Sequence, residues 1–396
     1  MCSPTIKGGA RAMQFEFVSA GRILFGAGTV RQAAPMAAEL GRKAMLVTGS
    51  DPGRAAGLLT SLVEKGIVAL TFAVSGEPTL DTARQATTAA RDARCDLVIG
   101  FGGGSALDIG KIVAALLTNS GDPLDYAEVV GRGKKISRPS APFIAIPTTA
   151  GTGAEVTKNA VVASPEHRVK ASLRSNWMLP TAAIVDPELT LGLPPEPTAS
   201  SGLDALTQLI EPFVTSRANP LTDALCREGI RRVARSLKRA YQNGADLEAR
   251  EDMALASLFG GLGLANAGLG VVHALAGPFG AMFPAPHGAT CAALLPSAME
   301  VNIQAARARE PEGEFLRRCE EVARILTGRA QATAEEGVQW IQELSRVLNV
   351  RPLKAYGLTD AELPGLVERS KSTSSMKANP VPLTDEEIRQ IIVRSA

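Results

Sequence analysis

The sequence predicts an α/β half of the Rossmann-like type followed by an all-α half. Three observations lead to this prediction. Apolar runs alternate with helical patterns up to residue 193, glycine-rich turns follow the apolar runs, and the pattern from residue 194 onward is helical almost to the end. A chain of 396 residues has room for roughly two domains. We expect them at residues 1–193 and 194–396.

The first half contains five apolar runs that are typical of buried strands, at residues 43–48, 67–72, 96–101, 141–147 and 182–186. Helical patterns at residues 55–65 and 79–93 separate the first three runs. This alternation indicates a parallel sheet with helices on both faces. Because ligands of such sheets bind beyond the carboxyl ends of the strands, we expect Gly49, Gly76, Gly102 and Thr148 to lie near a ligand.

The run Gly102-Gly103-Gly104-Ser105 follows the third of these strands and precedes a helical pattern at residues 112–117. Glycines let a phosphate approach the backbone closely, and a helix N-terminus offers free N–H groups to it. The run therefore predicts a pyrophosphate site for a dinucleotide. A tight turn without a ligand is the alternative interpretation.

Composition argues against several classes of function. A net charge of +2 and the lack of a basic run with interleaved aromatic residues disfavour nucleic-acid binding. No apolar run is long enough to span a membrane, and residues 1–7 lack the apolar core of a secretory signal. The cysteines are scattered without Cys-x-x-Cys spacing, which favours reduced thiols in the cytoplasm. We expect Cys95 and Cys291 to be small core residues.

In the second half, helices are expected at residues 204–214, 221–241, 249–275, 315–326, 334–348 and 385–393. The proline-rich residues 193–198 break the pattern and are predicted to form a hinge. The glycines between residues 260 and 270 indicate close helix packing. We expect Glu211 at a helix surface, and His167 of the first half in an exposed loop.

The helical half also holds a candidate metal site. His273 and His287 are two of only three histidines and fall in one segment, while Asp204 and Gln208 stand four residues apart on one helix face. An acid, an amide and two imidazoles form a donor set that suits Fe(II) or Zn(II). The alternative is a pair of structural histidines beside a helix-terminal aspartate.

The chain resembles the iron-containing (group III) alcohol dehydrogenases from about residue 17 to residue 396. This family shares its fold with glycerol dehydrogenases, maleylacetate reductases and dehydroquinate synthases. The motifs that carry the resemblance occur in order: residues 25–28, Gly102 to Ser105 with Asp108 and Lys111, residues 147–157, Asp204-Ala205-Leu206, residues 266–270 leading to His273, Pro286-His287-Gly288, and Asn379-Pro380.

The resemblance implies a dinucleotide-binding domain, a helical metal- and substrate-binding domain, and a catalytic cleft between them. It implies reversible hydride transfer between an alcohol and NAD or NADP, with a divalent metal, Fe(II) or Zn(II), as Lewis acid. Family members are commonly homodimers or larger homo-oligomers. The positions that match cofactor contacts are Gly102, Gly103, Gly104, Ser105, Asp108, Thr148, Thr149, Thr152, Thr157, Lys170 and Leu189. The metal positions are Asp204, Gln208, His273 and His287, of which the acid and the two histidines would act in catalysis through the metal.

Two positions depart from the family pattern. Gln208 stands where the family has its first metal histidine, and a neutral amide is a weaker ligand. This departure keeps two other functions open: a metal-free reductase of an oxo acid, similar to maleylacetate reductase, and an inactive nucleotide-binding subunit. Gly277 stands where many members carry a histidine near the substrate. We therefore expect a larger pocket, for a bulkier substrate or one that brings its own polar group.

The choice of nicotinamide depends on the end of the first strand. Gly49 aligns with the aspartate that binds the adenosine ribose in NAD-preferring members. A glycine there removes the repulsion of a 2′-phosphate, and Arg54 would pair with that phosphate. Asp51 would replace the missing acid if the loop shifted slightly. We expect tolerance of NADP, with NAD through Asp51 as the alternative.

Overall fold

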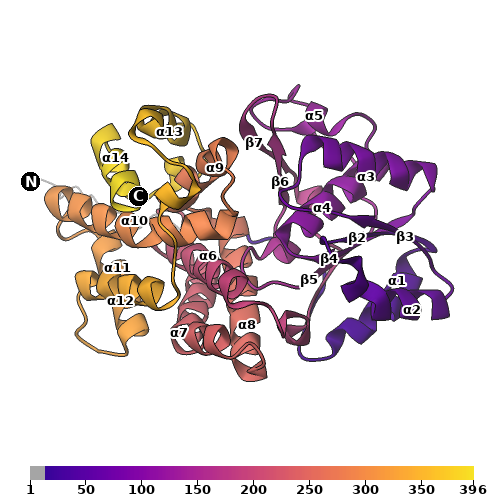
Figure 1. Cartoon of the computed structure of the whole chain (residues 1–396), viewed down its shortest axis with the longest axis horizontal. Helices are drawn as coiled ribbons and strands as arrows, with labels where there is room; N and C mark the ends of the chain where they lie inside the picture. Colours follow the sequence, from indigo (N-terminus) through magenta and orange to yellow (C-terminus); the bar gives the residue numbers. More distant parts are fainter. Residues whose placement is uncertain (1–13) are drawn as a thin grey trace, which may run out of the picture.

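The computed structural model describes residues 14–396, which form a sheet half and a helical half side by side (Figure 1). Cys2 and the N-terminal stretch for which we expect no secretory signal lie outside the described residues. The last strand of the sheet ends at Val185 and the first long helix begins at Pro195. The predicted boundary between residues 193 and 194 falls in the segment that connects them.

The sheet half is built on a six-stranded parallel sheet of β1 (Ile23–Phe25), β2 (Lys43–Thr48), β3 (Val68–Ala73), β4 (Leu97–Gly102), β5 (Phe143–Pro147) and β8 (Ala182–Val185). The order is β1-β8-β5-β4-β2-β3, so the chain changes direction across the sheet between β2 and β4. All the predicted strands are present. β1 was not predicted because a strand of three residues is too short to show a period.

Helices cover both faces of this sheet because its side chains alternate in direction. Met45 and Val47 of β2 pack with α3 (Leu80–Asp92) and α4 (Gly104–Thr118), whereas Leu46 packs on the other face with α1 (Ala33–Leu40) and α2 (Ala56–Glu64). The predicted helices at residues 55–65 and 79–93 are thus confirmed. A single turn, α5 (Pro123–Tyr126), follows α4.

An antiparallel hairpin of β6 (Asn159–Ser164) and β7 (Val169–Arg174) was not predicted. Its contact with α4 depends on the fully buried Lys111, whose Nζ donates to Thr157 Oγ1 and to the Asn159 carbonyl, both at 2.7 Å. Asp108 accepts from the Val161 N–H at 2.9 Å and pairs with Lys111 at 3.2 Å. These polar contacts fix the hairpin over the N-terminal part of α4.

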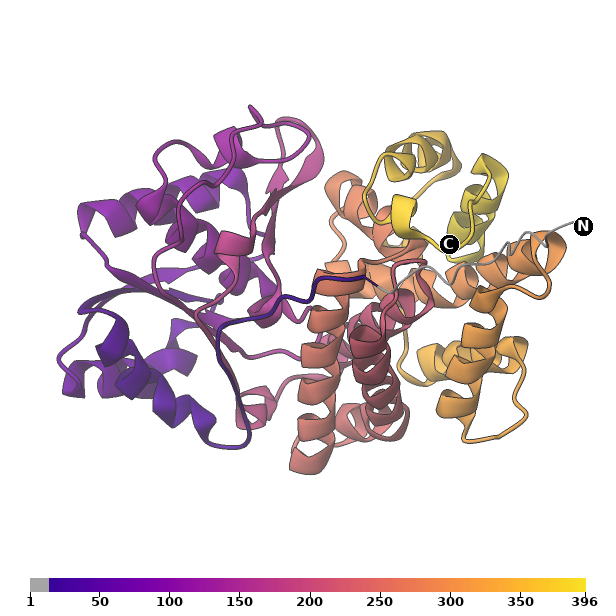
Figure 2. The ribbon, with the colours of Figure 1, turned by 180° about the vertical axis from the view of Figure 1, so that it is seen from behind.

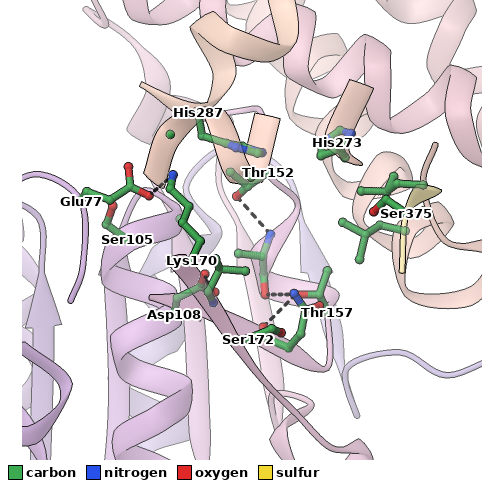
Figure 3. Close-up of a pocket in the computed structure, with 18 of the residues that line it drawn as sticks. Glu77, Ser105, Asp108, Thr152, Thr157, Lys170, Ser172, His273, His287 and Ser375 are labelled. Carbon is green, nitrogen blue, oxygen red and sulfur yellow. Dashed lines mark hydrogen bonds and ion pairs between the residues drawn. The ribbon is translucent and has the colours of Figure 1, made fainter. Parts of the chain in front are cut away.

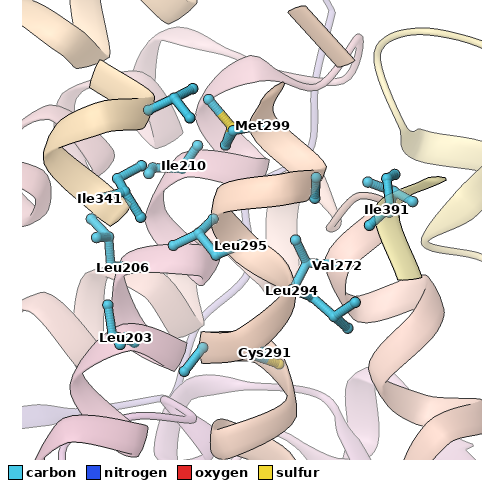
Figure 4. Packing of buried hydrophobic residues seen from close by; sticks show 14 of the residues in the cluster. Leu203, Leu206, Ile210, Val272, Cys291, Leu294, Leu295, Met299, Ile341 and Ile391 are labelled. Carbon is cyan, nitrogen blue, oxygen red and sulfur yellow. The ribbon is translucent and has the colours of Figure 1, made fainter. Parts of the chain in front are cut away.

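The helical half contains α6 (Pro195–Val214), α7 (Pro220–Gln242), α8 (Leu247–Ala267), α9 (Val271–Met282), α10 (His287–Arg309), α11 (Glu314–Thr327), α12 (Ala334–Val347), α13 (Leu363–Lys371) and α14 (Asp385–Arg394). Leucine and isoleucine side chains from α6, α10, α12 and α14 meet in one core (Figure 4). Residues 193–198 do not form a separate linker, since α6 already begins at Pro195, and their role as a hinge stays a prediction. Proline fits there because the first helical turn needs no N–H.

The single helix predicted over residues 249–275 was also wrong. The chain forms α8 and α9, which are separated at Gly268, where φ is +81°. Among residues 14–396, no single helix is long and apolar enough to cross a membrane. The helices α8 and α9 reach that length and hydropathy only when they are taken together, and they form a pair bent by 98°. The predicted close packing of the glycines is present, since a Cβ on Gly261 would lie 2.3 Å from the Gly153 carbonyl oxygen.

A segment before β1 crosses from the sheet half to α8 on the back of the molecule (Figure 2). The Asn266 side chain of α8 accepts from the Val18 N–H at 2.6 Å and donates to the Val18 carbonyl at 2.9 Å. Phe17 and Ala20 pack near Leu258 of α8. The two halves are therefore joined both through this segment and through the connection to α6.

Candidate active site

A cavity of about 680 Å³ lies between the two halves and is lined by residues of both (Figure 3). Many of the predicted site residues line it: Gly104, Ser105, Asp108, Thr152, Thr157, Lys170, Gln208, His273, Gly277 and His287. Gly49, Asp51, Gly102, Gly103, Thr148, Thr149 and Leu189 are not among its lining residues, and neither is the buried Asp204. The structure thus brings the glycine loop and the histidines to one cavity.

The glycine loop connects the end of β4 to the start of α4. A Cβ on Gly102 would lie 2.7 Å from Ala106 Cβ and 3.0 Å from the Gly49 nitrogen, so only glycine fits there. Thr48 and Phe101 are in register, which places the carboxyl ends of β2 and β4 next to each other at the point where the strand order reverses. The N-terminus of α4 at such a point is a suitable site for a pyrophosphate.

Lys170 and Glu77 form an ion pair in the cavity, with 2.5 Å between Nζ and Oε1 (Figure 3). The Lys170 side chain is only 5% exposed. Lys170 is therefore a cavity residue and not a surface lysine. Asp108 and Thr157, which also line the cavity, use their side-chain oxygens to hold Lys111.

The residues expected near the adenosine ribose lie after β2. A Cβ on Gly49 would have no atom within 4 Å, so there is room at this position. Asp51 is exposed and accepts from the Gly53 N–H at 2.9 Å, which caps a short 3₁₀ helix. Arg54 donates to the Leu189 carbonyl at 2.6 Å. Two of the charged groups considered for ribose or phosphate recognition thus have partners within the chain.

Three helices bring the metal-site residues together. Asp204 lies on α6, His273 on α9 and His287 on α10, and the Asp204 Oδ1 atom is 3.4 Å from His273 Nε2 and 4.0 Å from His287 Nε2. Oδ1 is buried and has no hydrogen-bond partner among the described residues. A buried carboxylate oxygen without a donor fits a cation, because leaving it unpaired is costly.

Cys291 also belongs to this group. The potential ligand atoms of Asp204, His273, His287 and Cys291 all lie within 4.8 Å of one another. The cysteine was expected only as a core residue, and it is indeed fully buried, but it borders the site as well. Its position one helical turn after His287 is a spacing that a sequence analysis could have used.

Glu211 was predicted at a helix surface, and this prediction was wrong. Its carboxylate is buried, accepts from the Val272 N–H at 2.8 Å and pairs with His273 Nδ1 at 2.7 Å. A carboxylate can only accept, so Nδ1 donates to Glu211, and Nε2 is the nitrogen that faces the site. Burial lowers the pKa of the His273 imidazole, but Cys291, Glu211 and Asp204 outweigh this effect, and the pKa is well above its usual value. Asp204, Gln208 and Glu211 have the spacing of one helix face, which was the signal for this role.

Gln208 holds its amide in a fixed orientation. Nε2 donates to the Gly151 carbonyl at 2.9 Å, which leaves Oε1 as the free oxygen. That oxygen is buried and accepts no hydrogen bond from any residue in the described range 14–396. Gln208 therefore offers a neutral oxygen at the cavity, at the position where the resemblance described above implies an imidazole.

The protonation states of the site follow from burial and charge. Burial lowers the pKa of the His287 imidazole to about 4, so this ring is neutral at physiological pH and its lone pair is available. Burial raises the pKa of the Asp204 carboxyl, but the neighbouring His273 and His287 outweigh it, and the pKa is lower than usual. Burial raises the pKa of the Cys291 thiol to about 12.

The cavity has a glycine loop at the switch point of a parallel sheet on one side and a buried carboxylate–imidazole group on the other. This combination defines a dinucleotide-linked, metal-assisted oxidoreductase. The sequence profile "Iron-containing alcohol dehydrogenase" matches residues 20–187, and "Fe-containing alcohol dehydrogenase family, C-terminal" matches residues 198–396. The chain belongs to the iron-containing alcohol dehydrogenase family, whose members use NAD(P) and iron.

Similar proteins cover nearly the whole chain. Alcohol dehydrogenase 4 of Saccharomyces cerevisiae is 36% identical over 89% of this chain and 91% of its own length. The 1,3-propanediol dehydrogenase of Klebsiella pneumoniae is 35% identical over 89% of this chain and 90% of its own length. The crystal structure of a 1,3-propanediol oxidoreductase superposes with a TM-score of 0.89 at 32% identity, covering 97% of this chain and 100% of that one. The structure of a sulfoacetaldehyde reductase of Bifidobacterium kashiwanohense in complex with NAD⁺ has a TM-score of 0.83 at 29% identity. The superposition covers 96% of this chain and 98% of that one.

Proposed function

We propose that this enzyme interconverts an alcohol and its aldehyde by hydride exchange with NAD(P), on a divalent metal held by Asp204, His273 and His287. The observation that carries the proposal is the Asp204 Oδ1 atom, which is buried, has no hydrogen-bond donor among residues 14–396, and lies 3.4 Å and 4.0 Å from the two imidazole nitrogens. Two imidazole nitrogens and a carboxylate oxygen in this arrangement suit Fe(II) or Zn(II).

The metal, when bound, supplies a Lewis acid that polarises the carbonyl and favours the alkoxide, and the nicotinamide carries the hydride. The chain supplies binding and orientation. Gly102 and the N-terminus of α4 receive the pyrophosphate, while Glu211 fixes the orientation of the His273 ring. Apolar side chains of Leu264, Leu269 and Phe283 line the cavity and exclude water.

The substrate side of the cavity contains Gly277, where a Cβ would have no atom within 4 Å. A histidine at this position would fill part of the space. The open space beside Gly277 therefore supports a bulkier substrate. The same position has no acid–base group, so proton exchange depends on the cofactor ribose and the solvent. Gly49 leaves room in the same way on the adenosine side, which supports tolerance of NADP as well as NAD.

The proposed setting is the cytoplasm, and the proposed assembly is a homodimer or a larger homo-oligomer. Cys95, Cys226, Cys291 and Cys319 are free and buried in the described part of the chain, which supports a reducing compartment. Ile23 on β1 and Val68 on β3 are exposed apolar side chains at the two edges of the sheet, which supports self-association. Light scattering on the purified protein gives the mass of the assembly.

The experiment follows oxidation of NADH and of NADPH against a panel of short and long aldehydes and of oxo acids. We expect turnover of aldehydes with both cofactors, and Gly277→His should lower turnover of the long aldehydes and spare the short ones. Turnover of oxo acids alone would favour the metal-free reductase that Gln208 leaves open. Cofactor binding without turnover of any carbonyl would indicate an inactive subunit, and an equal effect of Gly277→His on all aldehydes would refute the pocket argument.

A further inference from the structure

Cys291 lies on α10 one turn after His287, and its side chain is fully buried (Figure 4). Its Sγ atom is 3.8 Å from His273 Nε2 and 3.7 Å from His287 Nε2. These are the two nitrogens that face Asp204 Oδ1. The sulfur is thus in contact with the same pair of atoms as the proposed ligand oxygen.

The distances among these atoms resemble those within one coordination sphere. Around a tetrahedral zinc, with Zn–N of about 2.05 Å and Zn–S of about 2.3 Å, two ligand atoms N and S lie about 3.6 Å apart. Nitrogen and oxygen ligands lie about 3.4 Å apart in the same geometry. The two Sγ···Nε2 distances of 3.7 and 3.8 Å and the Oδ1···Nε2 distances of 3.4 and 4.0 Å are close to these values.

The site has one imidazole fewer than the family resemblance implies, so a further donor beside it would strengthen metal binding. The family resemblance implies four protein ligands, and Gln208 occupies the position of one of the histidines. Its amide nitrogen is tied to the Gly151 carbonyl and its oxygen is neutral. A thiolate is a far stronger ligand for zinc than an amide oxygen.

We propose that the Cys291 thiolate is the fourth protein ligand of the metal and that it biases the site toward zinc over iron. The proposal rests on the metal site of the proposed function. On binding, the Cys291 S–H bond breaks, its electron pair forms the bond from sulfur to Zn²⁺, and the proton passes to solvent. A zinc held by these four residues would still be able to take a substrate oxygen, since catalytic zinc sometimes becomes five-coordinate.

The test uses the full-length protein, stripped of metal and loaded with Co(II) or Zn(II). With Co(II), the wild type should show visible d–d bands together with a near-ultraviolet band from thiolate-to-metal charge transfer. Cys291→Ser and Cys291→Ala should keep bound cobalt but lose the charge-transfer band. Cys95→Ala is the matched control, because Cys95 is also a buried free thiol but lies just before β4 in the sheet half, and this variant should keep both bands.

X-ray absorption of the zinc-loaded wild type gives a second readout that needs no variant. One sulfur neighbour at about 2.3 Å is expected beside nitrogen and oxygen neighbours. Cys291→Ser should lower zinc affinity by about 100-fold or more, since loss of an outer-shell partner alone costs about 10- to 100-fold. It should lower iron affinity less, which reduces the preference for zinc.

The outcomes separate the two proposals. A metal bound only to nitrogen and oxygen, with the same spectrum in Cys291→Ala, would overturn the thiolate ligand and leave the proposed function intact. A charge-transfer band that survives in Cys291→Ser would also overturn the proposal of a thiolate ligand. A protein that binds neither Co(II) nor Zn(II) in stoichiometric amount would overturn both the thiolate ligand and the metal-dependent function.

Discussion

At the sheet end, the proposed pyrophosphate site depends on the backbone of a glycine loop and the start of α4, whereas the proposed metal site at the helical end is formed by side chains. Gly102 lies so close to Ala106 and to the Gly49 backbone that it admits no Cβ, and α4 offers its N–H groups beside it. At the other end, Asp204 and His273 come from separate helices, and Glu211 holds the ring of His273.

This difference determines which substitutions should disrupt ligand binding at each end of the cavity. A backbone site is sensitive to added volume, since the ligand and the neighbouring strands need the same space. A side-chain site is sensitive to the loss of one polar atom, because the other groups are then buried without a partner. Substitutions at the two ends should therefore separate cofactor binding from metal binding.

The largest effect is expected for Asp204→Ala. Its carboxylate is the anionic group between the two imidazoles, so its removal should abolish tight metal binding. Loss of Lewis-acid assistance worth several kcal/mol predicts a drop in kcat of about 10³-fold or more. Metal analysis and steady-state kinetics measure this, and NADH binding should be retained. A variant that keeps its metal or its turnover would contradict the assignment of this carboxylate.

The next effect is expected for Gly102→Val at the sheet end. The added side chain collides with Ala106 and the Gly49 backbone, so we expect a loss of about 1–3 kcal/mol in the free energy of unfolding and loss of NADH binding. Gly57→Ala is the control, since a Cβ there meets no atom within 4 Å on helix α2, and it should keep both properties. Chemical denaturation and NADH fluorescence report the two quantities. Normal NADH affinity in Gly102→Val would show that the loop is an ordinary turn.

Glu211→Gln should have a smaller effect, confined to the helical end. An amide still contacts His273, but it holds Nδ1–H less strongly than the buried carboxylate does at 2.7 Å. Metal affinity should fall by about 10- to 100-fold while NADH affinity is unchanged. Glu196→Gln, at an exposed position on the same helix α6, is the control and should leave metal affinity as it is. Equal metal affinities in the two variants would mean that Glu211 has only a structural role.

The smallest effect is expected for Gly49→Asp. A carboxylate after β2 should repel the 2′-phosphate and bind the ribose, which shifts the preference toward NADH by roughly tenfold. The ratio of kcat/KM for NADPH and NADH measures the shift. Asp51→Asn tests the alternative, and a large rise in the KM for NADH in that variant would show that Asp51 already binds the ribose.

The same comparison explains how much could be predicted from the sequence. The glycine loop is a continuous run, so its strand and turn were predicted, but α4 begins at Gly104, ahead of the helical pattern predicted at residues 112–117. His287 was found because histidine is rare in this chain. Family motifs surround both Asp204 and His287 and also led to the aspartate. Glu211 and Cys291 were placed elsewhere, since their role appears only when α6, α9 and α10 come together. The break between α8 and α9 was missed because apolar residues continue on both sides of Gly268.

The central claim is that hydride transfer in this enzyme needs a divalent metal at Asp204, His273 and His287. The direct test is the rate of NADH oxidation with one good aldehyde substrate, measured on the native enzyme, after complete removal of metal, and after return of Zn(II) or Fe(II). The account predicts that turnover disappears on removal and returns with one equivalent of metal. Equal turnover by the metal-free enzyme would contradict it.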